Sequence, residues 1–412
     1  MYTPKNLTDC SFVLMEKTAA ELSGAELAMA RAEARLLSLP YCAALRTVLL
    51  SLESVAALRL ANIEASMVGL FRLEALLRQH GGANSNNAAL GHLLELDGCS
   101  TRGAADCVAA FRFRQLLDWL NEQIKPQTGF SPQLILEIRQ RCLNGPDATA
   151  ASGQPSADRQ PGFRDRDYPD CRPQDRRPCS EGDRGLYRPP AAGELDRHIQ
   201  GLCDYTNRRL LSPIAQSAVL HFYFESIKPF PDHLERTGQA LCHALHLKRG
   251  LYDGLLAPIS LLPAIDTPRQ QRYLKPYRHE PLRAGNDEFW ALQHWMEYCA
   301  RAMDVAVSGM DIYQRAIGAV IEHWQEQAGK VEKGSALECL LYALPGQPII
   351  TVTQAMQLTG KGFSAANDAL ARLEQTGVVR IGAPIGRNRS FVAHDALAAY
   401  DSINQKVLPR VP

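Results

Sequence analysis

The sequence predicts a mainly α-helical protein that ends in a small winged helix-turn-helix domain. Apolar residues recur every three to four positions along most of residues 1–330, which is the period of amphipathic helices. A strand-like alternation of apolar and polar residues around glycine-rich turns marks residues 378–393. We therefore expect a helical bundle with a small flap, followed by the C-terminal domain.

The composition is that of an ordinary globular protein. The chain has 412 residues, of which 46% are hydrophobic, and a formal net charge of +1. This length predicts two or three domains. A nearly neutral chain has no overall field that attracts nucleic acid, so DNA binding would need a local basic patch.

The cysteines and the N-terminus predict a cytoplasmic protein without a membrane partner. The 11 cysteines are an odd number with no CxxC pair, which favours reduced thiols. Only Cys171 and Cys179 lie close enough in the sequence to suggest a pairing. No basic region followed by an apolar core marks a signal peptide, and the longest apolar stretches are far too short to span a bilayer.

Residues 1–125 are predicted to form an N-terminal helical region. Helical periodicity runs from residue 24 to residue 79 and stops at the turn cluster "HGGANSNN", residues 80–87. A further helix is predicted over residues 106–124.

Residues 126–330 are predicted to form the core domain. Ser131-Pro132 is a good helix start for the segment that follows. Helical patterns then cover residues 192–207, 214–227 and 237–249. Further helical segments are predicted on both sides of residue 280.

The loop 145–190 interrupts the core domain with a stretch rich in Pro, Gly, Ser, Asp and Arg. Such a composition is usual for a linker, whereas a loop of this length inside a compact domain is often a lid or binding flap. Its Arg/Asp-rich part, residues 158–186, is either a solvated loop or a flap with altered partners.

Residues 335–412 are predicted to form the winged helix-turn-helix domain, from two short helices, a hairpin and a final helix. Arg387 and Arg389 lie at the hairpin tip, from which wings contact DNA phosphates or a minor groove. The predicted recognition helix has one basic residue beside two acidic ones, which weakens a sequence-reading role, and such domains also serve dimerisation. DNA and a second copy of the chain are therefore both candidate partners. DNA binding predicts a salt-dependent affinity that falls with Arg387→Ala and Arg389→Ala, and no binding at low salt would exclude it.

The stretch "KPFPDHLERTGQ", residues 228–239, resembles the Fic family motif His-Pro-Phe-x-(Asp/Glu)-Gly-Asn-Gly-Arg-x-x-Arg. Pro229, Phe230, Asp232 and Arg236 match it. The preceding "HFYFESI" resembles the helix that leads into this motif, and the loop 145–190 occupies the place of the substrate flap.

Further features extend the resemblance over residues 45–400. The segment with Arg269, Tyr273, Asp287 and Trp295 is similar to a family segment in looser spacing, and a winged helix is a common C-terminal appendage. The family's inhibitory helix has its nearest match at Glu64, for which a surface position on an amphipathic helix is the favoured interpretation. The resemblance implies the Fic fold.

The resemblance also implies which functional residues of the family motif are replaced in this chain. In the family the motif His is the general base for transfer of AMP from ATP, the acidic residue holds Mg²⁺, the two glycines form a phosphate nest, and the arginines bind phosphate. Here Lys228 stands at the base position, and its reference pKa near 10.4 predicts a protonated amine. His233, Leu234 and Glu235 replace the nest, and Gln239 replaces the last arginine.

The altered motif predicts a protein that does not use Mg²⁺ and a nucleotide for ordinary AMP transfer. The Fic fold would then serve as a regulatory or binding protein for a protein target, or as an enzyme that acts on a different small molecule through Lys228, Asp232, His233, Glu235 and Arg236. A protein-modifying transferase with a lysine-variant motif, and a winged-helix DNA-binding regulator, remain the alternatives.

His243 and His246 share a helix face and could hold a metal with Asp232 or His233, although satisfied core histidines are the favoured interpretation.

Overall fold

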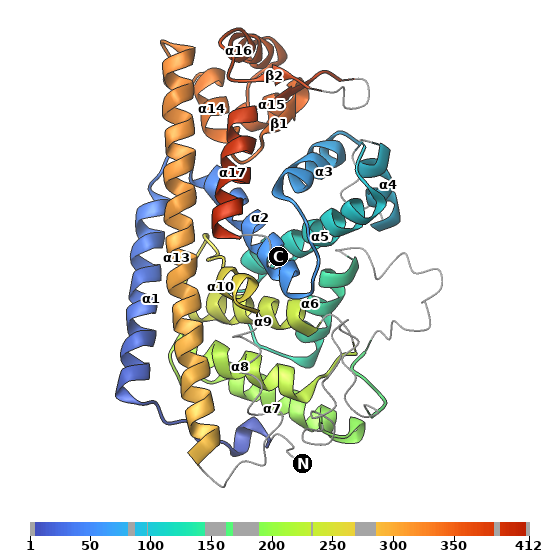
Figure 1. Ribbon diagram of the computed structural model, residues 1–412, viewed down its shortest axis with the longest axis vertical. Helices are drawn as coiled ribbons and strands as arrows, with labels where there is room; N and C mark the ends of the chain where they lie inside the picture. Colours follow the sequence, from blue (N-terminus) through green and yellow to red (C-terminus); the bar gives the residue numbers. More distant parts are fainter. Residues whose placement is uncertain are drawn as a thin grey trace.

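The computed structural model is mainly helical, as the sequence predicts (Figure 1). It describes residues 5–80, 87–96, 98–144, 162–167, 189–231, 234–267, 286–382 and 388–408. Asp232, His233, Arg269, Tyr273 and Arg387, most of the loop 145–190, and the candidate pair Cys171 and Cys179 lie outside these residues. The cysteines within them are all free thiols.

Two long helices run side by side along one edge of the molecule (Figure 1). They are α1, Glu16–Leu37, and α13, Asn286–Ala328, which has 43 residues and is therefore about 65 Å long. The N-terminal segment is fastened to α13 by hydrogen bonds of Gln293 to the backbone of Val13 and Met15, at 2.8 and 3.0 Å.

Three helices in the centre of the molecule are buried on nearly every side: α2, Cys42–Leu60, α8, Pro213–Ile227, and α9, Leu234–Arg249. A helix with apolar or small residues all around its surface is expected in a core position. The surrounding elements are η1 (Leu7–Asp9), α3 (Met67–His80), α4 (Asn87–Leu96), α5 (Thr101–Gln123), α6 (Pro132–Asn144), η3 (Ala192–Glu194), α7 (Leu195–Asn207) and α10 (Leu261–Ile265).

The C-terminal unit has the order α14 (Ala336–Ala343), β1 (Ile349–Thr351), α15 (Val352–Thr359), α16 (Phe363–Gln375), β2 (Arg380–Ile381), β3 (Ser390–Val392) and α17 (His394–Val407). Its sheet is antiparallel with strand order β1-β3-β2, and Ile350 and Ile381 both pair with Phe391. A capping box of Thr351 and Gln354 starts α15, and Gly360 ends it with a positive φ of 63°. The winged-helix assignment of this unit remains a prediction.

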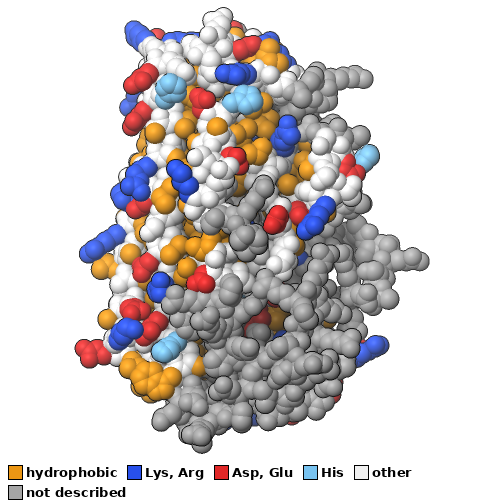
Figure 2. All heavy atoms as spheres, in the orientation of Figure 1, with side chains coloured by type: hydrophobic (Ala, Val, Ile, Leu, Met, Phe, Trp, Pro, Cys, Tyr) orange, Lys and Arg blue, Asp and Glu red, His pale blue; other side chains and the backbone are white. Residues whose placement is uncertain are grey.

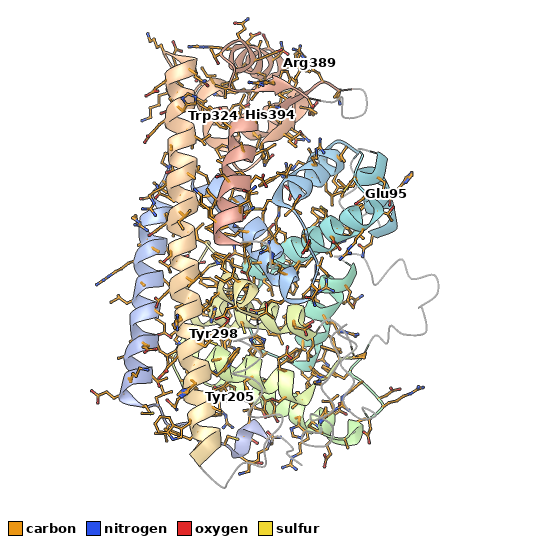
Figure 3. All side chains as sticks on the ribbon, in the orientation of Figure 1. Glu95, Tyr205, Tyr298, Trp324, Arg389 and His394 are labelled. Atoms are coloured by element: carbon orange, nitrogen blue, oxygen red, sulfur yellow. The ribbon has the colours of Figure 1, made fainter. Side chains whose placement is uncertain are left out.

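The C-terminal unit packs on α13 through α17. Trp324 of α13 donates from its indole N–H to Asp395 at the start of α17, at 3.2 Å (Figure 3). Tyr313 of α13 donates to Asn404 at 2.6 Å. One hydrophobic core therefore continues from the helical bundle into the C-terminal unit.

Glu64 differs from its expected position. It is exposed, as predicted, but it lies in the connection between α2 and α3, because α2 ends at Leu60 and Asn62 turns the chain with a positive φ of 57°. On the face that Figure 2 shows, acidic and basic side chains of the described residues are interspersed. None of the described helices is long and apolar enough to cross a membrane.

Candidate functional site

The motif loop begins where α8 ends, at Lys228. Pro229 follows, and a residue before proline is disfavoured in the helical conformation. Lys228 adopts a left-handed conformation with φ 42° and ψ 66°, and its N–H donates to the carbonyl of Phe224 at 3.2 Å. Only Lys228 and Asn62 have a positive φ among the described non-glycine residues. Such a conformation costs on the order of 1–3 kcal/mol, so the surroundings must hold it in place.

Arg164 holds the end of α8. This side chain is only 6% exposed and comes from residues 162–167, a described part of the loop 145–190. Its guanidinium donates to the carbonyls of Lys228 at 2.8 Å, Ile227 at 3.3 Å and Pro190 at 2.5 Å, and its backbone N–H donates to Pro229 at 3.0 Å. A positive side chain also complements the negative end of a helix. Arg164 therefore joins residues 162–167 to the motif loop.

An aromatic contact strengthens this junction. Phe163 stacks on Phe230 of the motif with ring centroids 5.4 Å apart, and Phe224 meets the same ring edge-on at 6.0 Å. The guanidinium of Arg139, on α6, lies 4.4 Å from the centre of the Phe230 ring. Phe230, one of the motif matches, is thus an anchor in the core.

Replacing Arg164 with alanine is expected to lower the free energy of unfolding by about 2–4 kcal/mol, because several buried carbonyls lose a charged donor. Arg164→Lys should recover part of the loss, since an ammonium group cannot reach the same set of acceptors at once. Urea unfolding of the variants measures both effects.

Arg166→Ala is the matched control, because the Arg166 side chain is exposed two residues away. It should change the free energy of unfolding by less than about 0.5 kcal/mol. Equal stability of Arg164→Ala and Arg166→Ala would contradict the role assigned to Arg164.

The motif residues of α9 lie in its first turns. Leu234 is buried, Glu235 is half-buried, and Arg236 is only 4% exposed. Glu235 supplies the acidic side chain of the first turn, where a carboxylate interacts favourably with the positive end of the helix. The helix terminus that would face a phosphate therefore already carries a negative charge.

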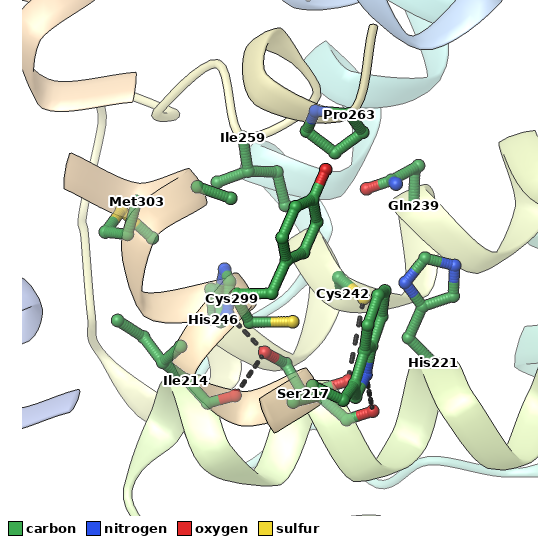
Figure 4. Close-up of a pocket in the computed structure, with 14 residues that line it drawn as sticks. Ile214, Ser217, His221, Gln239, Cys242, His246, Ile259, Pro263, Cys299 and Met303 are labelled. Atoms are coloured by element: carbon green, nitrogen blue, oxygen red, sulfur yellow. Dashed lines mark hydrogen bonds between the residues drawn. The ribbon is translucent and has the colours of Figure 1, made fainter. Parts of the chain in front are cut away.

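Gln239, at the position of the last motif arginine, lines a cavity among α8, α9, α10 and α13. Figure 4 shows it between Pro263 and His221, with its amide directed into the cavity. Trp295 of α13 also lines the cavity and donates from its indole N–H to the carbonyl of Ala218 at 2.9 Å. The last motif position is thus part of an interior cavity.

Glu53 of α2 is the centre of a buried hydrogen-bonded network. Its carboxylate accepts from His243 Nε2 at 2.8 Å, from the Ser260 hydroxyl at 2.7 Å and from the Ser260 N–H at 2.9 Å. The other ring nitrogen of His243, Nδ1, lies 2.7 Å from the hydroxyl of Tyr252. The side chains of Glu53 and His243 are both fully buried.

His246 continues the network to the cavity wall. Its Nδ1 lies 3.3 Å from the Tyr252 hydroxyl, and its Nε2 lies 2.7 Å from the Ser217 hydroxyl (Figure 4). Burial, and to a lesser degree the neighbouring His243, lower the pKa of His246 to about 3, so this imidazole is neutral at physiological pH. The Ser217 hydroxyl also lies 2.9 Å from the carbonyl of Ile214 and has one proton for the two acceptors.

The geometry allows one consistent assignment of protons in this network. If His243 donates to Glu53 from Nε2, its Nδ1 accepts from the Tyr252 hydroxyl. His246 then donates from Nδ1 to the Tyr252 oxygen, and its Nε2 accepts from Ser217. Each donor is used once, which makes His243 and His246 satisfied core histidines, the favoured interpretation of the sequence.

The described part of the chain contains no group of three or more potential metal ligands, and Asp232 and His233 of the metal alternative lie outside it. Glu225 of α8 is buried, with its carboxylate 3.9 Å from His221 Nε2. Sequence reasoning missed Arg164, Glu53, Ser217 and Tyr252. Arg164 lies in an aperiodic loop, and the others are joined only by contacts between distant segments.

At the C-terminal unit, Arg389 is engaged within the chain. Its guanidinium contacts Glu374 of α16 at 2.6 Å and lies 5.1 Å from the centre of the Phe391 ring (Figure 3). Arg372 donates to the carbonyls of Ala328 and Lys330, just after α13. DNA contact by Arg389 therefore remains a prediction and would compete with the ion pair to Glu374.

Comparison with known proteins identifies the domain that contains this loop. The model of the Fic/DOC family matches residues 129–246, which include α6 to α9 and the motif loop. Among solved structures, a Fic family protein from Desulfovibrio desulfuricans G20 is similar, with 13% sequence identity, a TM-score of 0.48, and coverage of 92% of this chain and 97% of that one. No curated protein matches the chain. The chain therefore contains a region, residues 129–246, that matches the Fic/DOC family model.

Proposed function

We propose that this Fic-domain protein does not transfer AMP and acts as a regulatory or binding protein. The first turn of α9 carries the proposal, because Leu234 and Glu235 stand where the family motif has small residues that let phosphate approach the backbone. Arg236, which would contact phosphate in the family motif, is almost completely buried.

Electrostatics support the proposal. A phosphate at the N-terminus of α9 would meet the carboxylate of Glu235. At about 4 Å and an effective dielectric constant near 20, one such pair of like charges costs on the order of 4 kcal/mol. That penalty is comparable to the gain expected from several phosphate hydrogen bonds.

The attachment of the flap to the loop also supports a structural role for the motif. Lys228 stands at the position of the family's general base, and its backbone carbonyl is bonded to Arg164. Phe230 is held between Phe163 and Phe224. The loop is thus built into the core through the same residues that resemble the family motif.

Thermal-shift measurements with Mg²⁺ and ATP, CTP, CDP-choline or UDP-sugars test this proposal. We expect no stabilisation by any of them, because only a ligand that binds the folded state raises its stability, by an amount that grows with the logarithm of ligand concentration over dissociation constant. A clear, Mg²⁺-dependent rise in melting temperature with one nucleotide would overturn the proposal. It would favour the alternative, a transferase with a lysine-variant motif that acts on that nucleotide.

A second candidate function is DNA binding by the C-terminal unit, favoured by the order of its helices and by the β2–β3 pairing. Because Glu374 neutralises Arg389, Glu374→Gln should raise a salt-dependent DNA affinity, and Arg389→Ala should lower it. DNA affinity that neither substitution changes would exclude Arg389 as a contact.

A further inference from the structure

The cavity that contains Gln239 has an apolar wall. Its volume is about 40 Å³, and its lining includes Ile259 just before α10, Pro263 within α10, and Trp295 and Met303 from α13. A space of this size holds roughly three water molecules or a small organic group. It is therefore far too small for a nucleotide.

The side chain of Gln239 is the unusual feature of this cavity. The residue is only 4% exposed, and its amide is directed into the cavity (Figure 4). Buried amides are nearly always hydrogen-bonded, because burial without a partner is unfavourable. A primary amide offers a donor and an acceptor side by side, so its best partner presents the complementary pair.

The groups around Gln239 favour a neutral partner. The Ser217 hydroxyl is already engaged with neutral His246, and burial raises the pKa values of the Cys242 and Cys299 thiols, which keeps them protonated. A carboxylate in this cavity would lose its hydration, and the described residues that line the cavity include no ammonium or guanidinium group to replace it.

We propose that this cavity binds a small, neutral carboxamide, or a molecule with the same adjacent donor and acceptor, through paired hydrogen bonds to the Gln239 amide. The apolar part of the ligand would lie against Trp295, Ile259 and Met303. This inference goes beyond the proposed function, because such a ligand could bind whether or not the motif loop takes a nucleotide.

Acetamide and propionamide are the probes. Acetone is a matched molecule that lacks the hydrogen-bond donor, and acetate lacks both the donor and the neutral charge. Titration of the full chain, followed by the NMR signal of the Trp295 indole N–H, should show saturable binding of the amides with dissociation constants in the range of about 1–50 mM. Acetate and acetone should bind at least about tenfold more weakly.

Gln239→Leu should weaken amide binding by about tenfold or more and leave acetone unaffected. Gln357→Leu, an exposed glutamine on α15, should leave all affinities unchanged. If Gln239→Leu does not fold, a crystal of the unmodified chain soaked in propionamide replaces it, and amide density within hydrogen-bond distance of Gln239 is expected. Three outcomes would overturn the inference: water alone at Gln239, equal binding of acetate and acetamide, or no saturable binding. None of them would change the result of the thermal-shift measurements with nucleotides.

Discussion

Replacing Glu53 with alanine is expected to lower the free energy of unfolding by about 3–5 kcal/mol. The carboxylate of Glu53 accepts hydrogen bonds from His243 and from two groups of Ser260, all of them buried. Alanine would leave these donors without an acceptor, and an unsatisfied buried donor carries its full desolvation cost. Urea unfolding followed by circular dichroism measures the change.

Glu53→Gln separates the hydrogen bonds of Glu53 from its volume, and a substitution at an exposed glutamate serves as the control. Glu53→Gln keeps the shape and one acceptor oxygen, so we expect a loss clearly smaller than that of alanine. Glu326→Ala, an exposed position on α13, should change stability by less than about 0.5 kcal/mol. A Glu53→Ala variant as stable as the unmodified chain would show that this network does not hold α2 to α9.

Acidification is expected to destabilise the protein through His246. Its pKa is about 3 in the folded chain, because of burial, against an ordinary value of 6.5. Below pH 6.5 the unfolded chain therefore binds a proton that the folded chain excludes, and the free energy of unfolding falls by up to about 1.4 kcal/mol per pH unit. The loss should continue towards pH 3, below which both states are protonated.

The variant His246→Gln isolates this contribution, because burial also lowers the pKa of His198 and carboxylates titrate in the same range. Unfolding curves between pH 7.5 and 4.5 should show a shallower pH dependence for His246→Gln than for the unmodified chain. His323→Gln, at an exposed histidine of α13, should keep the full dependence. Identical slopes for all three proteins would contradict a neutral, buried His246.

Most helices could be predicted from the sequence because their apolar residues repeat at helical spacing. The segment 131–143 was predicted from its Ser-Pro start, and the structure confirms it with α6 beginning at Pro132 and Ser131 accepting from the N–H of Leu134. The end of α2 was harder to predict. Its periodicity continues towards Glu64, but the chain turns at Asn62.

The site could be predicted only in part. The motif loop was located by its resemblance to the Fic family, which the family model confirms for residues 129–246. Arg164 could not be predicted, since nothing in a proline- and glycine-rich segment indicates which arginine will cap a helix 64 residues later. Ser217 and Tyr252 belong to a network joined across four segments, and spacing within one segment contains no information about it.

The roles of the individual motif residues stay predictions. Asp232 and His233, at the metal-holding and nest positions of the motif, lie outside the described residues. Lys228, Glu235 and Arg236 lie at the end of α8 and the start of α9, as the motif requires. These groups are candidates for acting on a small molecule. AMP transfer is the reaction of this loop that can be assayed directly.

Transfer of radiolabelled AMP from ATP in the presence of Mg²⁺ tests the central claim most directly. The unmodified chain should label neither itself nor proteins of a bacterial lysate. A chain with Lys228→His, His233→Gly, Leu234→Asn and Glu235→Gly, which restores the base and the phosphate nest, should gain measurable labelling. Labelling by the unmodified chain that is lost in Lys228→Ala would contradict the claim that this Fic domain has given up AMP transfer.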